Sequence, residues 1–297
     1  MGGRRGVRTP ARRRGPPWGR AAAGPGAGAT PPVTAPERTE PAVAQAGRVE
    51  GNPVACCLSL SLTCARVAAV LRGRLEDVRR RIEQACAHCG RPPQSVTLIG
   101  VTKGIPAEVV REAVAFGVTD LGENRVQEAR AKQTALGSGL GARWHLIGHL
   151  QRNKVKLAVE LFDAIHSVDS AELIADLERH AAAANKIIEV FIQVNVSGEA
   201  TKFGCRPEEA TALAQRIQTL TRLRLVGLMT IAPYTDNPEE ARPVFRQLRE
   251  LRDRLVSTFH LPPSTFRLSM GMSHDFEVAI EELADVIRVG TAIFGAR

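Results

Sequence analysis

Val96-Thr-Leu-Ile-Gly-Val101, followed by Thr102-Lys103, is the first strong β-type run in the sequence, and similar short apolar runs recur after it. Eight such runs predict strands, at 96–101, 119–122, 144–148, 164–167, 188–195, 223–229, 265–269 and 286–290. Stretches with helical apolar spacing separate them, at 107–116, 126–136, 153–161, 170–184, 207–220, 238–258 and 276–283. This alternation predicts an α/β fold, a single closed (β/α)8 barrel of the TIM type. A doubly wound open sheet would give a similar order of elements and is the alternative.

A long amphipathic helix is predicted before the first strand, over residues 67–87 and ending near Gly90. Its apolar positions recur at intervals of three and four residues, at Val70, Leu71, Leu75, Val78 and Ile82. Because it precedes the first strand, we expect it to cover the barrel from outside as an additional N-terminal element.

Residues 1–66 differ in composition from the rest of the chain. They hold ten arginines and three glutamates, and therefore most of the net charge of +9, together with nine of the 18 prolines. We expect a disordered extension over 1–66 and one barrel domain over 67–297. A transit peptide or a start site set upstream of the true one are alternatives, although so much Pro and Gly disfavours the amphipathic helix of a transit peptide. The barrel itself carries little net charge and gives no case for nucleic-acid binding.

Membrane and metal sites find little support in the sequence. The apolar stretch 54–65 is shorter than the roughly 20 residues that span a bilayer. Cys86-Ala-His-Cys89 has the spacing of half a zinc site, but no second pair stands at a suitable distance. His145 and His149 are four residues apart, which places two ligands on one face only in a helix, whereas this segment begins as a strand. We therefore expect no metal, reduced thiols and a cytoplasmic protein.

Candidate chemistry collects where the strands end, since active groups of parallel barrels lie at the carboxyl ends of the strands. Lys103 directly follows the first strand. A lysine at the end of a buried strand is partly desolvated, which favours the free amine that attacks a carbonyl. An ordinary surface lysine is the alternative reading of Lys103 on its own.

The last two strands end in segments suited to a phosphate group. Ser269-Met-Gly-Met-Ser273 follows the seventh strand, and Arg288-Val-Gly-Thr-Ala292 closes the eighth. Gly271 and Gly290 let the backbone approach a ligand, while hydroxyl and amide groups bind phosphate oxygens. Arg288 points to the same side as Gly290 and needs an acceptor, for which a pyridine nitrogen is suitable.

These segments together resemble the pyridoxal phosphate homeostasis protein family, of the YggS/PROSC type, which is related to the barrel domain of alanine racemase. The resemblance covers about residues 67–297 and rests on Gly100-Val-Thr-Lys103, Gly122-Glu-Asn-Arg-Val-Gln-Glu128, residues 144–154, Gly227-Leu-Met229, Leu268-Ser-Met-Gly-Met-Ser273 and Ile287-Arg-Val-Gly-Thr-Ala-Ile-Phe-Gly295. Gly104 departs from the family, in which threonine often follows the lysine.

The resemblance implies a pyridoxal 5′-phosphate (PLP) cofactor held as a Schiff base on Lys103, with Asn124 near the ring and Arg288 facing the ring nitrogen. It places the phosphate against Ser269, Met272, Ser273, Gly290 and Thr291. Members of the family are regarded as cytoplasmic carriers or regulators of PLP without an established catalytic reaction. We accordingly expect a vitamin B6 homeostasis protein, a monomer, with PLP-requiring apoenzymes as partners.

Two enzymatic functions compete with this interpretation. An amino-acid racemase uses the same barrel, but adds a C-terminal β domain and a tyrosine as second base, whereas this sequence stops at Arg297 and has Tyr234 as its single tyrosine. A Schiff-base aldolase acting on a sugar phosphate also combines a strand-end lysine with a phosphate site. Arg288 argues against the aldolase, because such a site has no use for a partner to a pyridine ring.

Overall fold

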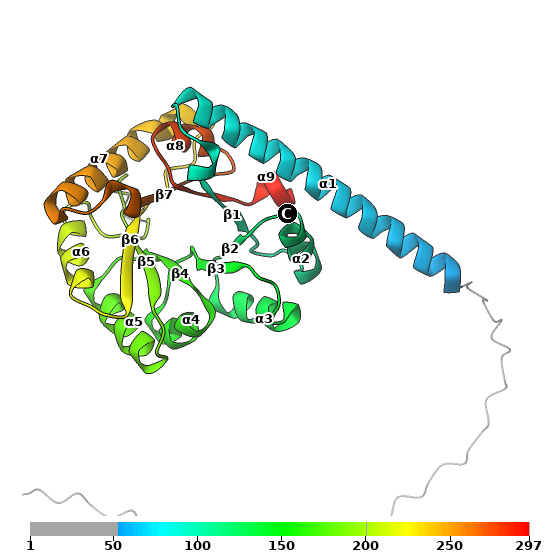
Figure 1. The fold of residues 1–297 in the computed structure, drawn as a ribbon, viewed down its shortest axis with the longest axis horizontal. Helices are drawn as coiled ribbons and strands as arrows, with labels where there is room; N and C mark the ends of the chain where they lie inside the picture. Colours follow the sequence, from blue (N-terminus) through cyan, green and yellow to red (C-terminus); the bar gives the residue numbers. More distant parts are fainter. Residues whose placement is uncertain (1–52, 200, 297) are drawn as a thin grey trace, which may run out of the picture. The chain divides into compact units, whose positions relative to one another are not determined.

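The computed structural model describes residues 53–199 and 201–296. Within these ranges, eight parallel strands close into a barrel in sequence order, with the last strand paired to the first (Figure 1). The strands are β1 (Thr97–Val101), β2 (Asp120–Glu123), β3 (Arg143–Leu146), β4 (Ala164–Val168), β5 (Ile188–Gln193), β6 (Leu223–Met229), β7 (Arg267–Met272) and β8 (Val286–Val289). The predicted (β/α)8 barrel is confirmed, and closure rules out the open sheet.

A helix follows each strand and packs on the outside of the barrel (Figure 1). These helices are α2 (Ala107–Ala115), α3 (Val126–Leu136), α4 (Val155–Leu161), α5 (Ala171–Ala183), α6 (Ala210–Gln218), α7 (Arg242–Phe259), α8 (Phe276–Glu281) and α9 (Thr291–Phe294). Short 3-10 turns precede four elements: η1 (Pro93–Ser95), η2 (Arg152–Lys154), η3 (Pro238–Ala241) and η4 (Pro263–Thr265).

The seventh strand lies later in the sequence than the pattern predicts. The turn η4 occupies Pro263–Thr265, so β7 begins at Arg267 and continues to Met272. Its pairing with β8 shifts register between Ser269 and Met272. Ser269 is therefore the third residue of the strand and not its last, which moves its side chain from the mouth of the barrel into the interior.

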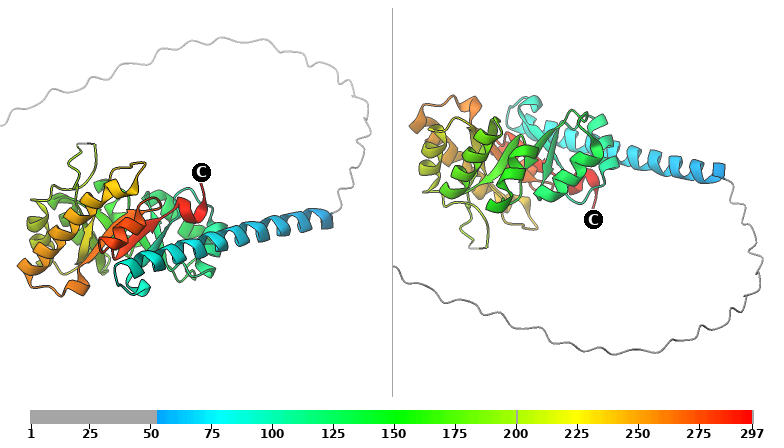
Figure 2. Two further views of the ribbon diagram at one scale, coloured as in Figure 1. Left: turned by 90° about the horizontal axis from the view of Figure 1, so that it is seen from above. Right: turned by 90° about the horizontal axis from the view of Figure 1, so that it is seen from below.

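The helix before the barrel, α1 (Pro53–His88), begins well before residue 67. The stretch 54–65 holds no Pro or Gly that would end a helix, so α1 extends through it. Buried Leu71, Leu75 and Val78 place α1 against α8, α9 and α2, as the predicted covering helix (Figure 2). The predicted boundary at residue 66 falls inside α1, so residues 53–66 of the extension expected over 1–66 are helical, and its residues 1–52 lie outside the described residues. No helix in the part of the chain that the structure describes is long and apolar enough to cross a membrane.

Two apolar clusters fill the molecule. The larger cluster lies between strands and helices and includes Phe162, Phe245 and Phe266. A separate small cluster is formed by Ile99, Phe191, Val226, Met229 and Val286. The remaining buried positions on the strands include charged and polar residues.

Candidate cofactor site

A cavity of about 470 Å³ lies at the carboxyl ends of the strands, where parallel barrels place their functional groups. Seven of the eight predicted site residues line it: Lys103, Asn124, Met272, Ser273, Arg288, Gly290 and Thr291. Ser269, the eighth, does not line it and is fully buried. Residues that are far apart in the sequence therefore converge on one cavity.

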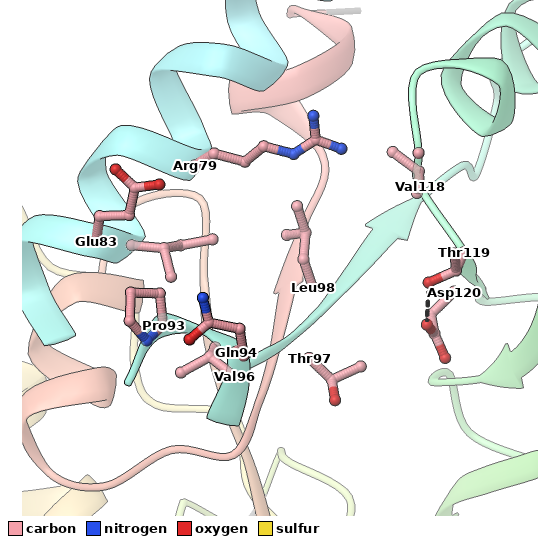
Figure 3. Close-up of a pocket in the computed structure, with 12 residues that line it drawn as sticks. Arg79, Glu83, Pro93, Gln94, Val96, Thr97, Leu98, Val118, Thr119 and Asp120 are labelled. Carbon is pink, nitrogen blue, oxygen red and sulfur yellow. Dashed lines mark hydrogen bonds between the residues drawn. The ribbon is translucent and has the colours of Figure 1, made fainter. Parts of the chain in front are cut away.

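A second pocket of about 410 Å³ lies at the opposite end, where β1 and β2 begin (Figure 3). Arg79 and Glu83 of α1 line one side of it, and Thr119 donates a hydrogen bond of 2.8 Å to Asp120 on the other. None of the predicted site residues lies in this pocket. The cavity at the carboxyl ends is therefore the candidate site.

Lys103 lies on a turn whose neighbouring residues are firmly held. The Thr102 hydroxyl donates to Glu123 at 2.6 Å, and the Thr102 carbonyl accepts a hydrogen bond from Lys132. The Gly104 amide donates to Glu128. Lys103 itself is exposed, contrary to the expected partial desolvation, because β1 ends at Val101 and the chain turns outward after buried Thr102. Its exposed side chain thus stands on a fixed backbone.

The Glu123–Lys132 ion pair beneath this turn was not predicted from the sequence. The Lys132 ammonium lies 2.6 Å from Glu123, whose side chain is fully buried. Burial raises the pKa of Glu123 above its ordinary value, although hydrogen bonds from Lys132 and Thr102 oppose the shift. Lys132 shares the buried face of α3 with Val126, Ala129 and Leu136. A lysine on the apolar face of a predicted helix is the signal that could have revealed the pair.

The segments after β7 and β8 are tied together by Ser273. Its hydroxyl accepts hydrogen bonds from the amides of Gly290, at 3.1 Å, and Ala292, at 3.3 Å. Gly271 has a different role from the expected approach to a ligand. A side chain there would lie 2.6 Å from Ala279, so Gly271 allows β7 to contact α8 closely.

Arg288 is 4% exposed and points from β8 into the cavity. It donates to the Ser269 hydroxyl at 2.7 Å and to the Thr230 carbonyl at 2.8 Å. Burial lowers its pKa to about 10, with a smaller opposing effect from Asp275. Within residues 53–199 and 201–296 it forms no ion pair. A buried guanidinium that is held by neutral acceptors alone is costly, and its remaining donors are available to an acceptor in the cavity.

Aromatic side chains that were not assigned to the site form part of the cavity wall. The His149 ring stacks on Phe203 with centroids 4.0 Å apart, and Tyr234 lies 5.1 Å from the His274 ring. The buried Nε2 atom of His274 has no hydrogen-bond partner among the described residues. His149 faces this cavity while His145 points into the barrel toward His166, so the two histidines do not converge on a metal.

Another close approach shapes the wall at Gly148. A side chain at this position would lie 2.3 Å from the carbonyl oxygen of Asn124. Only glycine therefore allows the segment after β3 to pass so near the end of β2, and this contact sets the position of Asn124 at the cavity.

The sequence of this chain is similar to those of proteins with known names. Residues 74–297 match the family "Alanine racemase, N-terminal domain". The pyridoxal phosphate homeostasis protein of Aquifex aeolicus is 46% identical over 224 residues, which cover 75% of this chain and 97% of the relative. The protein of the same name from Pseudomonas aeruginosa is 44% identical over 223 residues, 75% of this chain and 94% of the relative.

A solved structure agrees with these relatives. PipY of Synechococcus elongatus, determined with PLP bound, is 38% identical with a TM-score of 0.66, covering 76% of this chain and all of that chain. Sequence identity, coverage and fold point to the same relatives, and this chain belongs to the pyridoxal phosphate homeostasis protein family, within the alanine racemase-like barrels.

Proposed function

We propose that this chain binds PLP in the cavity at the carboxyl ends of the strands, holds it as a Schiff base on Lys103, and serves in intracellular PLP homeostasis. The observation that carries the proposal is the buried Arg288 guanidinium, which has no carboxylate partner in the described residues and faces the same cavity as Lys103. The PLP that is bound to the Synechococcus relative supports the choice of ligand.

The residues present fit such a ligand. The cavity volume of about 470 Å³ lies within the range of roughly 300–1,000 Å³ that is usual for cofactor pockets. The Ser273 hydroxyl offers a polar contact near the start of α9, and the unpartnered Nε2 atom of His274, a residue of the cavity wall, offers another. Arg288 offers a hydrogen-bond donor for a neutral acceptor such as a ring nitrogen. An aromatic ring with a phosphate arm uses each of these features.

Each residue then has a defined task. PLP supplies an aldehyde that condenses with amines and a pyridine ring. Lys103 provides the amine, and Arg288 donates a hydrogen bond to the ring nitrogen, which keeps that nitrogen unprotonated because a guanidinium cannot accept a proton. Asn124 lies beside the ring.

The phosphate is held by Met272, Ser273, Gly290 and Thr291, where two chain segments meet. We assign Ser269 to the support of Arg288 instead of the phosphate, because its hydroxyl is buried and already bonded to that guanidinium.

Chemical trapping tests the lysine. Borohydride reduction of the PLP-loaded protein should fix a phosphopyridoxyl group on the peptide that contains Lys103. Lys103→Ala should lose the adduct and the associated visible absorption while keeping the far-ultraviolet circular dichroism of the parent. Lys156→Ala, an exposed lysine on α4, is the matched control and should retain both signals. An adduct that persists in Lys103→Ala contradicts the assignment.

A racemase-like enzyme is the second candidate, because Tyr234 and His274 line the same cavity as Lys103 and are groups that can carry protons. Exchange of the α-proton of alanine in deuterated water separates the two functions. A holding protein should show no exchange above free PLP. Rapid exchange that disappears in Tyr234→Phe supports the enzyme.

The setting of this function is also proposed. We place the protein in the cytoplasm as a monomer that passes PLP to apoenzymes. Mass photometry of the full chain tests whether it is a monomer. Delivery is tested by following the absorbance of PLP as it passes from the loaded protein to an apoenzyme. The two proteins are mixed directly in one sample and are separated by a dialysis membrane in the other.

A further inference from the structure

Five polar side chains from five different strands meet in the interior of the barrel. They are nearly or fully buried, with at most 8% of any residue exposed. In strand order they are Asp120 (β2), His145 (β3), His166 (β4), Ser269 (β7) and Arg288 (β8). The barrel of this chain is thus crossed by polar groups where branched apolar side chains are the usual filling.

The five groups form a continuous series of hydrogen bonds. Asp120 Oδ1 lies 2.9 Å from His145 Nε2, and His145 Nδ1 lies 3.0 Å from His166 Nε2. His166 Nδ1 lies 2.9 Å from Ser269 Oγ, which in turn lies 2.7 Å from Arg288 Nη1. The series therefore runs from a carboxylate to a guanidinium through two imidazoles and one hydroxyl.

The two ends determine the direction of every bond between them. A guanidinium only donates, so Ser269 accepts from Arg288 and must place its own proton elsewhere. His166 Nδ1 is the only acceptor in reach of that hydroxyl among the residues the structure describes, so this nitrogen carries no hydrogen. The hydrogen of His166 is then on Nε2 and is donated to His145 Nδ1. His145 in turn carries its hydrogen on Nε2 and donates it to Asp120.

The electrostatic environment agrees with these protonation states. Burial lowers the pKa of His166 far below its ordinary value, and neighbouring His145 and Arg288 lower it further, so His166 is neutral. Burial tends to raise the pKa of Asp120, but hydrogen bonds from His145 and Thr119 outweigh that effect and lower it, so Asp120 is a carboxylate. The opposite bond direction would need a charged imidazole and would leave the Ser269 proton without an acceptor.

We infer that Asp120, His145, His166, Ser269 and Arg288 form a one-directional hydrogen-bond chain across the barrel, in which His166 is a positioning residue for Arg288. By accepting the Ser269 proton, His166 turns the oxygen lone pairs of that serine toward Arg288. Ser269 and the Thr230 carbonyl then fix two donors of the guanidinium and leave its other donors for a ligand. The effect on PLP rests on the proposed function, whereas the chain itself does not.

The acceptor end of the hydrogen-bond chain, Asp120, reaches the second pocket. Asp120 lines the pocket at the amino ends of β1 and β2, where Thr119 supplies its other hydrogen bond (Figure 3). The hydrogen-bond chain therefore connects the two ends of the barrel, and its route from Asp120 to Arg288 passes through two imidazoles and one hydroxyl.

Nitrogen-15 NMR of the full chain labelled at histidine tests the bond directions without any cofactor. His145 and His166 should both show the neutral form protonated at Nε2, and His166 should not titrate between pH 6 and 8. Assignment uses His145→Asn and His166→Asn. A hydrogen on Nδ1 of His166, or an imidazolium signal from either residue, would refute the proposed direction of the hydrogen bonds. A protein that binds no PLP would leave this result unaffected, which separates the inference from the proposed function.

Ligand binding tests the positioning role. His166→Phe keeps a ring against Phe191, which stacks on His166 at 4.1 Å, but removes the acceptor. We expect about tenfold weaker PLP binding, the size of one hydrogen bond to a charged group, and a shifted absorption band. His166→Asn retains an acceptor near the position of Nδ1 and should restore part of the PLP affinity and part of the parental absorption. His88→Phe, exposed on α1, should change neither.

Unchanged affinity and absorption in His166→Phe would refute the positioning role. If His166→Phe does not fold, His166→Asn still tests the positioning role, because a partial loss of PLP affinity is expected from it. Parental PLP affinity in folded His166→Asn, together with a hydrogen on Nδ1 of His166 in the parent, would contradict the inference.

Discussion

Different types of residue fill two buried regions of the molecule: the layer between the strands and the helices, and the interior of the barrel. The outer layer is a continuous apolar cluster that includes fully buried Phe162, Phe245 and Phe266. The interior holds a small apolar cluster of five residues and, beside it, a chain of hydrogen-bonded polar groups. The buried ion pair of Glu123 with Lys132 is a polar exception in the outer layer, between β2 and α3. Both regions are buried to the same degree, so burial alone does not predict which residues a region uses.

The difference shows that the two kinds of contact contribute differently to the stability of the fold and to the orientation of side chains. Apolar burial stabilises the fold and imposes little direction on its contacts. Hydrogen bonds between buried polar groups add little net stability but fix the orientation of each group, because an unpaired group in the interior is costly. The apolar contacts of the outer layer accordingly hold the barrel together. The buried polar groups direct the two cavity residues: the ion pair holds the turn of Lys103, and the interior groups hold Arg288.

The largest loss of stability is expected from the outer layer. Phe245→Ala removes a fully buried ring of α7 and should lower the free energy of unfolding by about 3–5 kcal/mol. Urea denaturation measures the loss. PLP binding by the protein that remains folded should not change, and an altered PLP affinity at full folding would show that the two regions are not separate.

A somewhat smaller loss is expected from the ion pair. Lys132→Met leaves the Glu123 carboxylate buried without its cation and should cost about 3 kcal/mol near neutral pH. The double variant Lys132→Met/Glu123→Gln removes the unpaired charge and should recover part of the loss. In contrast to Phe245→Ala, the single variant should also weaken Schiff-base formation, because Lys132 holds the Thr102 carbonyl next to Lys103.

The loss in Lys132→Met should depend on pH. The pKa of Glu123 is raised by folding, so this group favours the folded state below its unfolded pKa and loses that contribution as the pH rises through the folded pKa. Removal of Lys132 raises the folded pKa further. The difference in unfolding free energy between parent and variant should therefore be greater at pH 8 than at pH 5, and an equal difference at both would contradict the account.

The smallest effect is expected from a volume-conserving exchange in the interior cluster. Met229→Leu should change the free energy of unfolding by less than about 1.5 kcal/mol and leave PLP absorption unchanged. Leu248→Met, the reverse exchange in the outer layer, is the matched control. A large spectral change from Met229→Leu would mean that the apolar part of the interior also positions the ligand.

The sequence was sufficient to predict the order of elements and most of the cavity. Short strands such as β4 and β5 are buried along their whole length and are apolar at most positions, and this is why their pattern was easily recognised. The residues after the strands were also well placed, because a parallel barrel brings those ends together whatever the details of each strand.

The parts that were missed depend on contacts between elements that are distant in the sequence. The position of Ser269 required the turn η4 to be known, since a shift of the strand start changes which residue reaches the cavity. The partners of His145 and Lys132 come from other elements, Asp120 and His166 in one case and Glu123 in the other. Local spacing carries no information about such pairs, although a lysine on a buried helix face and histidines within strands are signals worth following.

The fixed turn around Lys103 has a consequence for the kinetics of loading and release. Thr102 and Gly104 are anchored, whereas the Lys103 side chain is exposed. A flexible arm on a rigid base can bring its amine to an aldehyde by rotation about side-chain bonds, while the proposed Schiff base would form with loss of water and be released by hydrolysis or by exchange with another amine. The ordering of one such side chain costs at most about 2 kcal/mol of conformational entropy, and the backbone on both sides of it is already fixed.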